Sequence, residues 1–174
     1  IGLSQLCFIF VVHLKIKNKM NNQTIQKFQI IGISTRTINT NGQSAIDIEV
    51  LWQKFWKEDI QSQIPNVISD EIYAVYTDYE TDFTGAYTTI IGLPVSSLAI
   101  IPDGFVGLEI ETCTYQKLVS KGKMPEAVGN TWLEIWADKE LNSKRAYKSD
   151  FTIHGKKYYH GNDAEVETYL SVTE

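Results

Sequence analysis

The sequence predicts an α+β fold made of two β-α-β-β repeats. The first observation is a pair of WxxxW motifs, Trp52 with Trp56 and Trp132 with Trp136, which together hold all 4 tryptophans of the chain. The second is that two stretches rich in Tyr, Thr, Val and Ile follow each motif, and another precedes it. We therefore expect one helix and an antiparallel hairpin in each half of the chain.

Each WxxxW motif predicts a helix, because residues four positions apart lie on the same side of a helix. Ser44 or Asp47 can cap the first helix, which is expected to end before Pro65. Pro125 and Glu126 are typical of the first turn of a helix and predict where the second one begins.

The strand-like stretches are marked by β-branched and aromatic residues and are bounded by residues that form turns. In each half, two of them are expected to form a hairpin after the helix. The expected strands are 28–38, 72–80 and 86–95 in the first half and 105–119, 146–154 and 164–172 in the second.

The length of 174 residues is typical of one domain. We assign this domain to residues 28–174, with repeats at 28–95 and 104–172, and treat residues 1–27 as an N-terminal extension outside the core. Met20 is then a candidate native start; the alternative is an extra strand at a sheet edge or in a dimer. The apolar run 6–14 is too short to span a membrane and lacks the basic residues that begin a signal peptide, which favours a cytoplasmic protein.

Composition excludes several classes of function. The net charge of −5 gives no basic surface for nucleic acid. Cys7 and Cys113 form no CxxC motif, and His13, His154 and His160 lack the spacing of metal ligands. No nucleotide-binding, zinc-protease or serine-hydrolase motif is present, so we predict no catalytic residue, metal or cofactor.

The last strand has the clearest alternation in the chain. Glu165, Glu167 and Tyr169 share one face, and Val166, Thr168, Leu170 and Val172 share the other. On the neighbouring strand, Asp150, Thr152 and His154 are expected to join the polar face, with Thr77, Tyr79, Tyr87 and Thr89 at the equivalent place in the first half.

Carboxylates beside aromatic rings suit a cationic, apolar ligand, because ring faces attract cations and the acid balances the charge. The alternative is a sheet face that is merely half solvated. For the tryptophans, we expect one of each pair in the core and the other beside a cleft. The candidate ligand-binding residues are Trp52, Trp56, Tyr76, Tyr79, Tyr87, Trp132, Trp136, Glu165, Glu167 and Tyr169.

Residues 28–172 resemble the GyrI-like small-molecule-binding domains, which also form the effector-binding halves of AraC- and MerR-type multidrug-responsive regulators. The resemblance is carried by LWQKFW (51–56), by 72–92, by GNTWLEIW (129–136) and by 162–172. It implies two β-α-β-β repeats related by a pseudo-two-fold axis, in an antiparallel sheet whose helices flank a central groove for hydrophobic, often cationic compounds. One strand that commonly reads F-E-x-Y in relatives is FTIH here, so Thr152 stands where an acid is expected. Charge recognition would then pass to Glu165 or Glu167.

The resemblance implies a stand-alone protein that binds a small hydrophobic or cationic effector, as an accessory to a transcription regulator or by sequestering a drug. One alternative is a GyrI-like hydrolase of reactive toxins, which Thr152 disfavours because acid–base chemistry needs a titratable group near the substrate. The other is an interaction module that acts on gyrase or a regulator. A homodimer or a regulator is the protein partner we consider.

Overall fold

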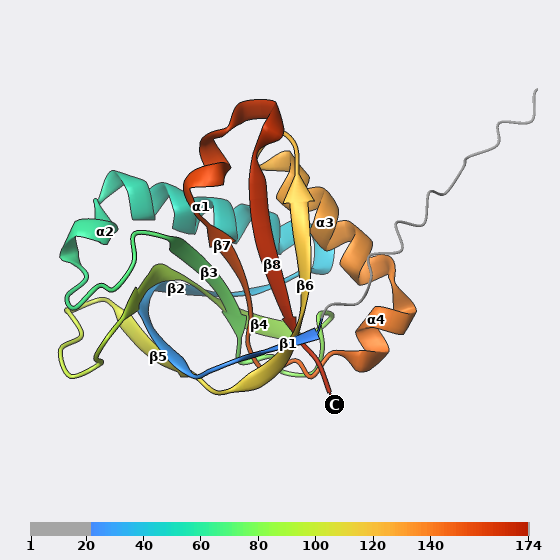
Figure 1. Cartoon of the computed structure of the whole chain (residues 1–174), viewed down its shortest axis with the longest axis horizontal. Coiled ribbons are helices and arrows are strands. Elements are labelled where there is room, and N and C mark those ends of the chain that lie inside the picture. Colours follow the sequence, from blue (N-terminus) through green and yellow to red (C-terminus); the bar gives the residue numbers. More distant parts are fainter. Residues whose placement is uncertain (1–21, 174) are drawn as a thin grey trace, which may run out of the picture.

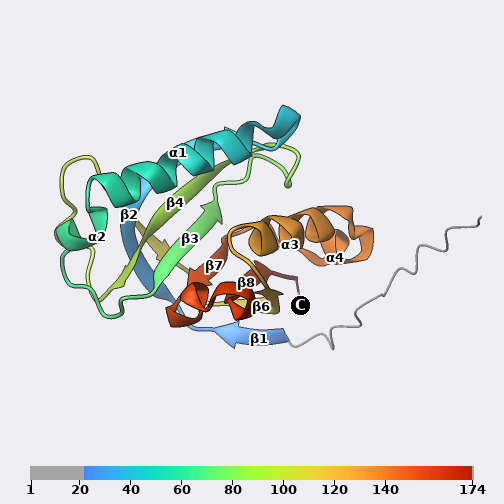
Figure 2. The ribbon, with the colours of Figure 1, turned by 90° about the horizontal axis from the view of Figure 1, so that it is seen from above.

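A computed structural model describes residues 22–173 and shows one eight-stranded antiparallel sheet that carries its helices on one face (Figures 1 and 2). The predicted α+β fold is confirmed. The expectations about Met20 as a start and about the apolar run 6–14 lie outside the described residues. Within residues 22–173, none of the helices has the length and apolar character needed to cross a membrane.

The two repeats follow the predicted order of elements. The first consists of β2 (Phe28–Ile38), α1 (Gln43–Lys57), the short α2 (Ile60–Gln63), β3 (Ile72–Thr77) and β4 (Ala86–Val95). The second consists of β6 (Cys113–Lys121), α3 (Glu126–Ala137), the short α4 (Lys139–Lys144), β7 (Asp150–His154) and β8 (Glu165–Ser171). Two further strands, β1 (Asn22–Ile25) and β5 (Val106–Ile110), complete the sheet.

The strand order β1-β6-β8-β7-β3-β4-β2-β5 shows the pseudo-symmetry directly. Each strand of one half has its counterpart at the same distance from the central β7–β3 pair: β6 corresponds to β2, β8 to β4, and the edge strand β1 to the edge strand β5. The two halves therefore meet at β3 and β7, and their helices lie above this junction.

Two expected boundaries need correction. The sheet begins before Phe28, because residues 22–25 form β1 and pair with β6 from Asn22↔Gln116 to Ile25↔Cys113. The stretch expected as one strand, 105–119, is divided between β5 and β6. β5 pairs with β2 and β6 pairs with β8, towards opposite ends of the sheet. The extended strand must therefore be interrupted between them.

Two apolar clusters fill the two faces of the sheet. On the helix face, Ile31, Ile91 and Leu170 pack with Phe55 of α1 and Ile135 of α3. The other face holds a second cluster to which all eight strands contribute, because Ile25 of β1 and Ile110 of β5 join it from the two edges. The sheet must curl for its edges to reach one cluster, and we call this side the concave face (Figure 1).

The helices begin differently from each other. The second long helix begins at Glu126 after Pro125, as predicted. The first follows Gly42, whose φ of 72° lies in the left-handed region that glycine adopts without strain. Asp47 does not cap it; its carboxylate instead accepts a hydrogen bond from Thr37 Oγ1 at 2.6 Å and so ties α1 to β2.

Candidate functional site

A cavity of about 940 Å³ lies on the helix face of the sheet, where the two repeats meet. Its sides come from α1 and α3, and its floor comes from β3, β4 and β7, through residues such as Ile72, Tyr76, Tyr87 and His154. Figure 2 shows α1 and α3 on the same side of these strands. Such a volume is at the upper end of the range for pockets that hold drug-sized molecules.

One wall is a row of aromatic rings that runs from α1 to the segment after β7. Trp52 stacks with Trp56 at 6.2 Å between ring centroids, and the His154 ring lies 4.9 Å from that of Trp52. Tyr158 lies 5.4 Å from His154, and Tyr159 continues the row. The predicted i, i+4 pairing in the first motif thus produces a continuous ring surface along the cavity.

The opposite wall is built around the second motif. Trp132 and Trp136 lie 6.1 Å apart, and Phe83 from the β3–β4 loop stacks on Trp136 with the two rings nearly parallel. Trp132 meets Tyr76 of β3 edge to face at 4.8 Å, and Tyr76 in turn contacts Tyr87 of β4. Rings from both repeats therefore interlock in this wall.

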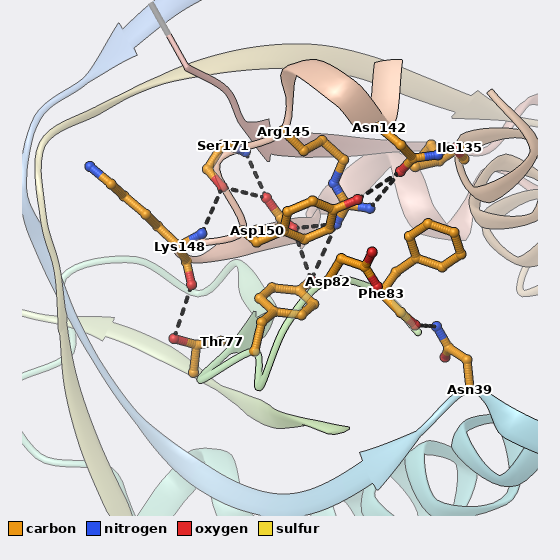
Figure 3. Close-up of polar contacts among 12 residues, drawn as sticks. Asn39, Thr77, Asp82, Phe83, Ile135, Asn142, Arg145, Lys148, Asp150 and Ser171 are labelled. Carbon is orange, nitrogen blue, oxygen red and sulfur yellow. Dashed lines mark hydrogen bonds and ion pairs between the residues drawn. The ribbon is translucent and has the colours of Figure 1, made fainter. Parts of the chain in front are cut away.

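A buried ion pair lies behind Tyr79. Tyr79 Oη donates to Asp150 Oδ2 at 2.8 Å, and Arg145 Nη2 donates to the same oxygen at 2.6 Å. Both charged side chains are fully buried. The other carboxylate oxygen accepts hydrogen bonds from Ser171, and Arg145 also reaches Asn142 (Figure 3). Burial, followed by the charge of Asp150, raises the pKa of Tyr79, so its ring presents a neutral phenol to the cavity.

A second polar link holds the β3–β4 loop against the start of α1. Tyr87 Oη donates to Asn39 Oδ1 at 2.8 Å. Asn39 Nδ2 in turn donates to the carbonyl oxygen of Phe83 at 2.8 Å (Figure 3). This link fixes the loop that carries Phe83, and hence the position of its ring against Trp136.

The charged groups of the cavity are acidic. Among the described residues that line it, Glu49 and Glu126 are carboxylates and none is Lys or Arg. Both glutamates are exposed, one on each of the flanking helices, so they lie at the mouth of the cavity. Burial lowers the pKa of His154 to about 4 and raises that of Tyr76, which keeps the floor uncharged near neutral pH.

Seven of the ten predicted site residues line this cavity. The expected division of each tryptophan pair into a core and a cleft residue holds only in part, because all four line the cavity and only Trp132 is also a member of the core cluster. Their burial still differs: Trp132 is 8% exposed, whereas Trp56 is 52% exposed. The seven are Trp52, Trp56, Tyr76, Tyr79, Tyr87, Trp132 and Trp136.

Glu165, Glu167 and Tyr169 are not brought to the cavity. Tyr169 pairs in register with Phe151, and both rings belong to the cluster on the concave face. Lys121 and Lys157 form ion pairs with Glu165 at 2.8 and 2.7 Å and lower its pKa to about 2. Glu167 likewise pairs with a lysine, Lys117. These carboxylates face away from α1 and α3.

The same registration corrects the expected polar face. Thr152 and His154 alternate with Phe151, so they lie on the helix face rather than beside Glu167 and Tyr169. In the first half, Tyr76 of β3 lines the cavity, and Thr77 points the other way and contacts Ser149. The alternation along each strand was correctly predicted; the face that meets the helices was not.

Several lining residues were not anticipated, notably Glu49, Phe83, Glu126 and Tyr158. For Glu49 a signal existed, because it precedes Trp52 by three positions and therefore shares its side of the helix. Phe83 lies in the β3–β4 loop, Tyr158 lies in the segment after β7, and Glu126 is the first residue of α3. Helical periodicity does not indicate that these three residues line the cavity. Within residues 22–173, no group of three or more His, Cys, Asp or Glu side chains is arranged to hold a metal.

The chain is similar to known proteins in sequence and in fold. The chain is 27% identical over 169 residues to YobU of Bacillus subtilis (strain 168), named as a candidate transcriptional regulator, covering 95% of this chain and 98% of that protein. It is 29% identical to an integron cassette protein from Vibrio cholerae, with a TM-score of 0.68 over 88% of this chain and 95% of that one.

The fold is also similar to that of SAV2435 bound to tetraphenylphosphonium, at 15% identity and a TM-score of 0.73, covering 89% of this chain and 94% of that one. The family model described as Cass2, integron-associated effector binding protein, matches residues 23–172. This match confirms the resemblance to effector-binding domains. Because it takes in both repeats and the cavity between them, the chain belongs to the family of integron-associated effector binding proteins.

Proposed function

We propose that this protein binds a hydrophobic organic cation as its effector, in the cavity between α1 and α3. The observation that carries the proposal is the composition of the lining, where aromatic rings from both repeats surround a space whose charged groups are two carboxylates. Aromatic faces attract cations because their quadrupole presents negative charge there. The same ring faces and carboxylates would repel an anion.

The two kinds of residue have separate roles. The rings provide contact area and shape, and the buried bonds of Tyr79 and Tyr87 hold those rings in place before a ligand arrives. Such preorganisation lowers the entropic cost of binding. Thr152 stands where the family resemblance leads one to expect an acid. Glu49 and Glu126 supply the negative charge instead, at the mouth of the cavity. The tetraphenylphosphonium bound to SAV2435 supports a cationic ligand for this fold.

The test uses two ligands of nearly the same size and shape but opposite charge, tetraphenylphosphonium and tetraphenylborate. Binding is measured by isothermal titration and by quenching of tryptophan fluorescence. We expect the cation to bind at least tenfold more tightly than the anion. In the double variant Glu49→Gln/Glu126→Gln the preference should shrink by about three- to tenfold, because two solvent-exposed charge pairs are typically worth about 0.2–1 kcal/mol each.

The matched control is Glu165→Gln, which removes the same charge from the concave face. It should leave the affinity for the cation within about twofold of the wild type, because Glu165 already faces two lysines there. Equal affinity for the cation and the anion in the wild-type protein would contradict the proposal. So would a loss in Glu165→Gln that matches the loss in the double variant.

A further inference from the structure

We infer that the effector binds with its cationic group at the mouth of the cavity, between Glu49 and Glu126, and with an uncharged hydrogen-bonding group on the floor, against Tyr76 and His154. The inference rests on the proposed function, since it takes the cavity as the effector site. The ligand class is a monocation in which an aromatic body separates the charge from a hydroxyl, ether or carbonyl group.

The hydroxyl of Tyr76 is the first polar group of the floor. Tyr76 is 8% exposed, lines the cavity, and is held edge to face by Trp132. Its polar neighbours are Thr152 and Trp132, which lower its pKa against the larger effect of burial. Thr152 Oγ1 also pairs with His154 Nε2 at 2.9 Å, which links the two polar groups of the floor. The phenol is neutral, largely buried and part of the cavity lining.

His154 is the second polar group. Its ring lies against Trp52 of α1 on one side and Tyr158 on the other, and Ile72 of β3 is its partner in the sheet. None of these neighbours is charged, and burial lowers the pKa of the imidazole to about 4. Because Nε2 is engaged by Thr152, Nδ1 is the nitrogen that remains for a ligand. The floor thus offers a hydroxyl and a neutral imidazole nitrogen.

A cation on this floor would find no counter-charge. The nearby buried carboxylate, Asp150, is committed to Arg145 at 2.6 Å and also accepts hydrogen bonds from Tyr79 and Ser171. Moving a cation into such surroundings removes its hydration without compensation, which is strongly unfavourable. An uncharged polar group loses little, because the floor can satisfy its hydrogen bonds.

The mouth has the opposite character. Glu49 and Glu126 are exposed on the two helices, and Trp56, another lining residue of α1, is 52% exposed. A cation held there keeps part of its hydration while it gains an aromatic face and two carboxylates, of which Glu126 also lies 3.7 Å from Lys123 Nζ in an exposed ion pair. Charge and hydrogen bonding are therefore separated along the depth of the cavity, which gives the ligand one orientation.

The test compares two phosphonium cations that differ in one group remote from the charge: (4-hydroxybenzyl)triphenylphosphonium and (4-methylbenzyl)triphenylphosphonium. The dissociation constants of both are measured by titration at pH 6.5 for each variant. Their ratio within one variant is the readout, because a general loss of stability affects both ligands alike. We expect the wild type to prefer the hydroxyl compound by about fivefold or more.

Tyr76→Phe and His154→Phe retain the rings and remove the polar atoms. Each should bring the ratio towards one while largely preserving the affinity for the methyl compound. Glu49→Gln/Glu126→Gln should weaken both cations equally and leave the ratio unchanged. The matched control is Glu134→Gln, an exposed residue of α3 outside the cavity lining, and it should change neither constant by more than about twofold.

Three outcomes would overturn the inference. If the wild-type ratio is near one, or if the preference for the hydroxyl compound persists in both Tyr76→Phe and His154→Phe, the floor does not bind the polar group of the ligand. The proposed function stands in that case. If the ratio changes in the glutamate variants, the ligand lies the other way round. If neither cation binds the wild type, the proposed function fails as well.

Discussion

His154 shows how a single residue is adapted to this cavity. It occupies the fourth position of FTIH, where its ring packs between Trp52 and Tyr158 and its Nε2 is bonded to Thr152. Burial makes the charged imidazolium unfavourable and lowers its pKa from the usual value to about 4. The consequence is a polar yet uncharged side chain in the floor of the cavity.

This pKa predicts a pH dependence of stability. Between about pH 6.5 and 4 the unfolded chain binds a proton at His154 that the folded protein does not, so the free energy of unfolding falls as the pH is lowered. From pH 7 to pH 5 the loss should be about 2 kcal/mol for this group. Urea unfolding at both pH values measures it.

The control for this measurement is His154→Phe, which keeps a ring between Trp52 and Tyr158 but cannot titrate. Its free energy of unfolding should change by at least 1 kcal/mol less than that of the wild type over the same range. Parallel pH profiles for the two proteins would show that His154 titrates normally in the folded state. Carboxylates contribute mainly below this window, because their pKa values lie lower.

At the scale of elements, α1 and α3 use their tryptophans in two ways. The helices are related by the pseudo-symmetry, and all four rings line the cavity, yet Trp132 is 8% exposed and Trp56 is 52% exposed. Trp132 packs with the core cluster of the helix face and contacts Tyr76, whereas Trp56 lies at the mouth. The same motif therefore places a buried ring on one helix and an exposed ring at the cavity on the other.

Two alanine variants should separate these roles. Trp132→Ala should lower the free energy of unfolding by about 3–5 kcal/mol, because it leaves a cavity in the core, and should also weaken binding of tetraphenylphosphonium. Trp56→Ala should change stability by less than about 1 kcal/mol and still weaken binding several-fold. Thermal unfolding and titration on the same samples decide between them; equal destabilisation by both changes would contradict the burial difference.

At the scale of the molecule, the sheet joins both repeats through the central β3–β7 pair and closes each edge with an additional strand. On one edge this strand is β1, which pairs with β6 through four residues and places Ile25 against the concave cluster. The part of the chain before Phe28 thus contributes to the domain, in contrast to the expectation that the core begins there.

Two truncations test the contribution of β1. A chain that starts at Met20 keeps β1 and should melt at the same temperature as the full chain. A chain that starts at Phe28 loses β1 and exposes β6 as a new edge, which should cost at least about 1 kcal/mol, or roughly 2–4 °C in melting temperature for a domain of this size. Equal melting of both truncations would show that β1 adds no stability.

The sequence by itself determined the repeated β-α-β-β plan, both tryptophan helices and the alternation along the strands. These features follow from local periodicity, which is present in any one segment regardless of its partners. The aromatic part of the cavity was predictable for the same reason, because residues four apart on a helix must share a side. The family resemblance followed from these segments as well.

Only the tertiary structure decided which face of each strand meets the helices. Alternation shows that Glu165, Glu167 and Tyr169 share a face of the strand. It does not show which face of the sheet this is, because that depends on the register with the neighbouring strand. Here Tyr169 pairs with Phe151, and both turn to the concave side. The two acids of the cavity, Glu49 and Glu126, lie on helices from different repeats and line the same cavity only because the fold places these helices across one groove. A local sequence pattern carries no information about that placement.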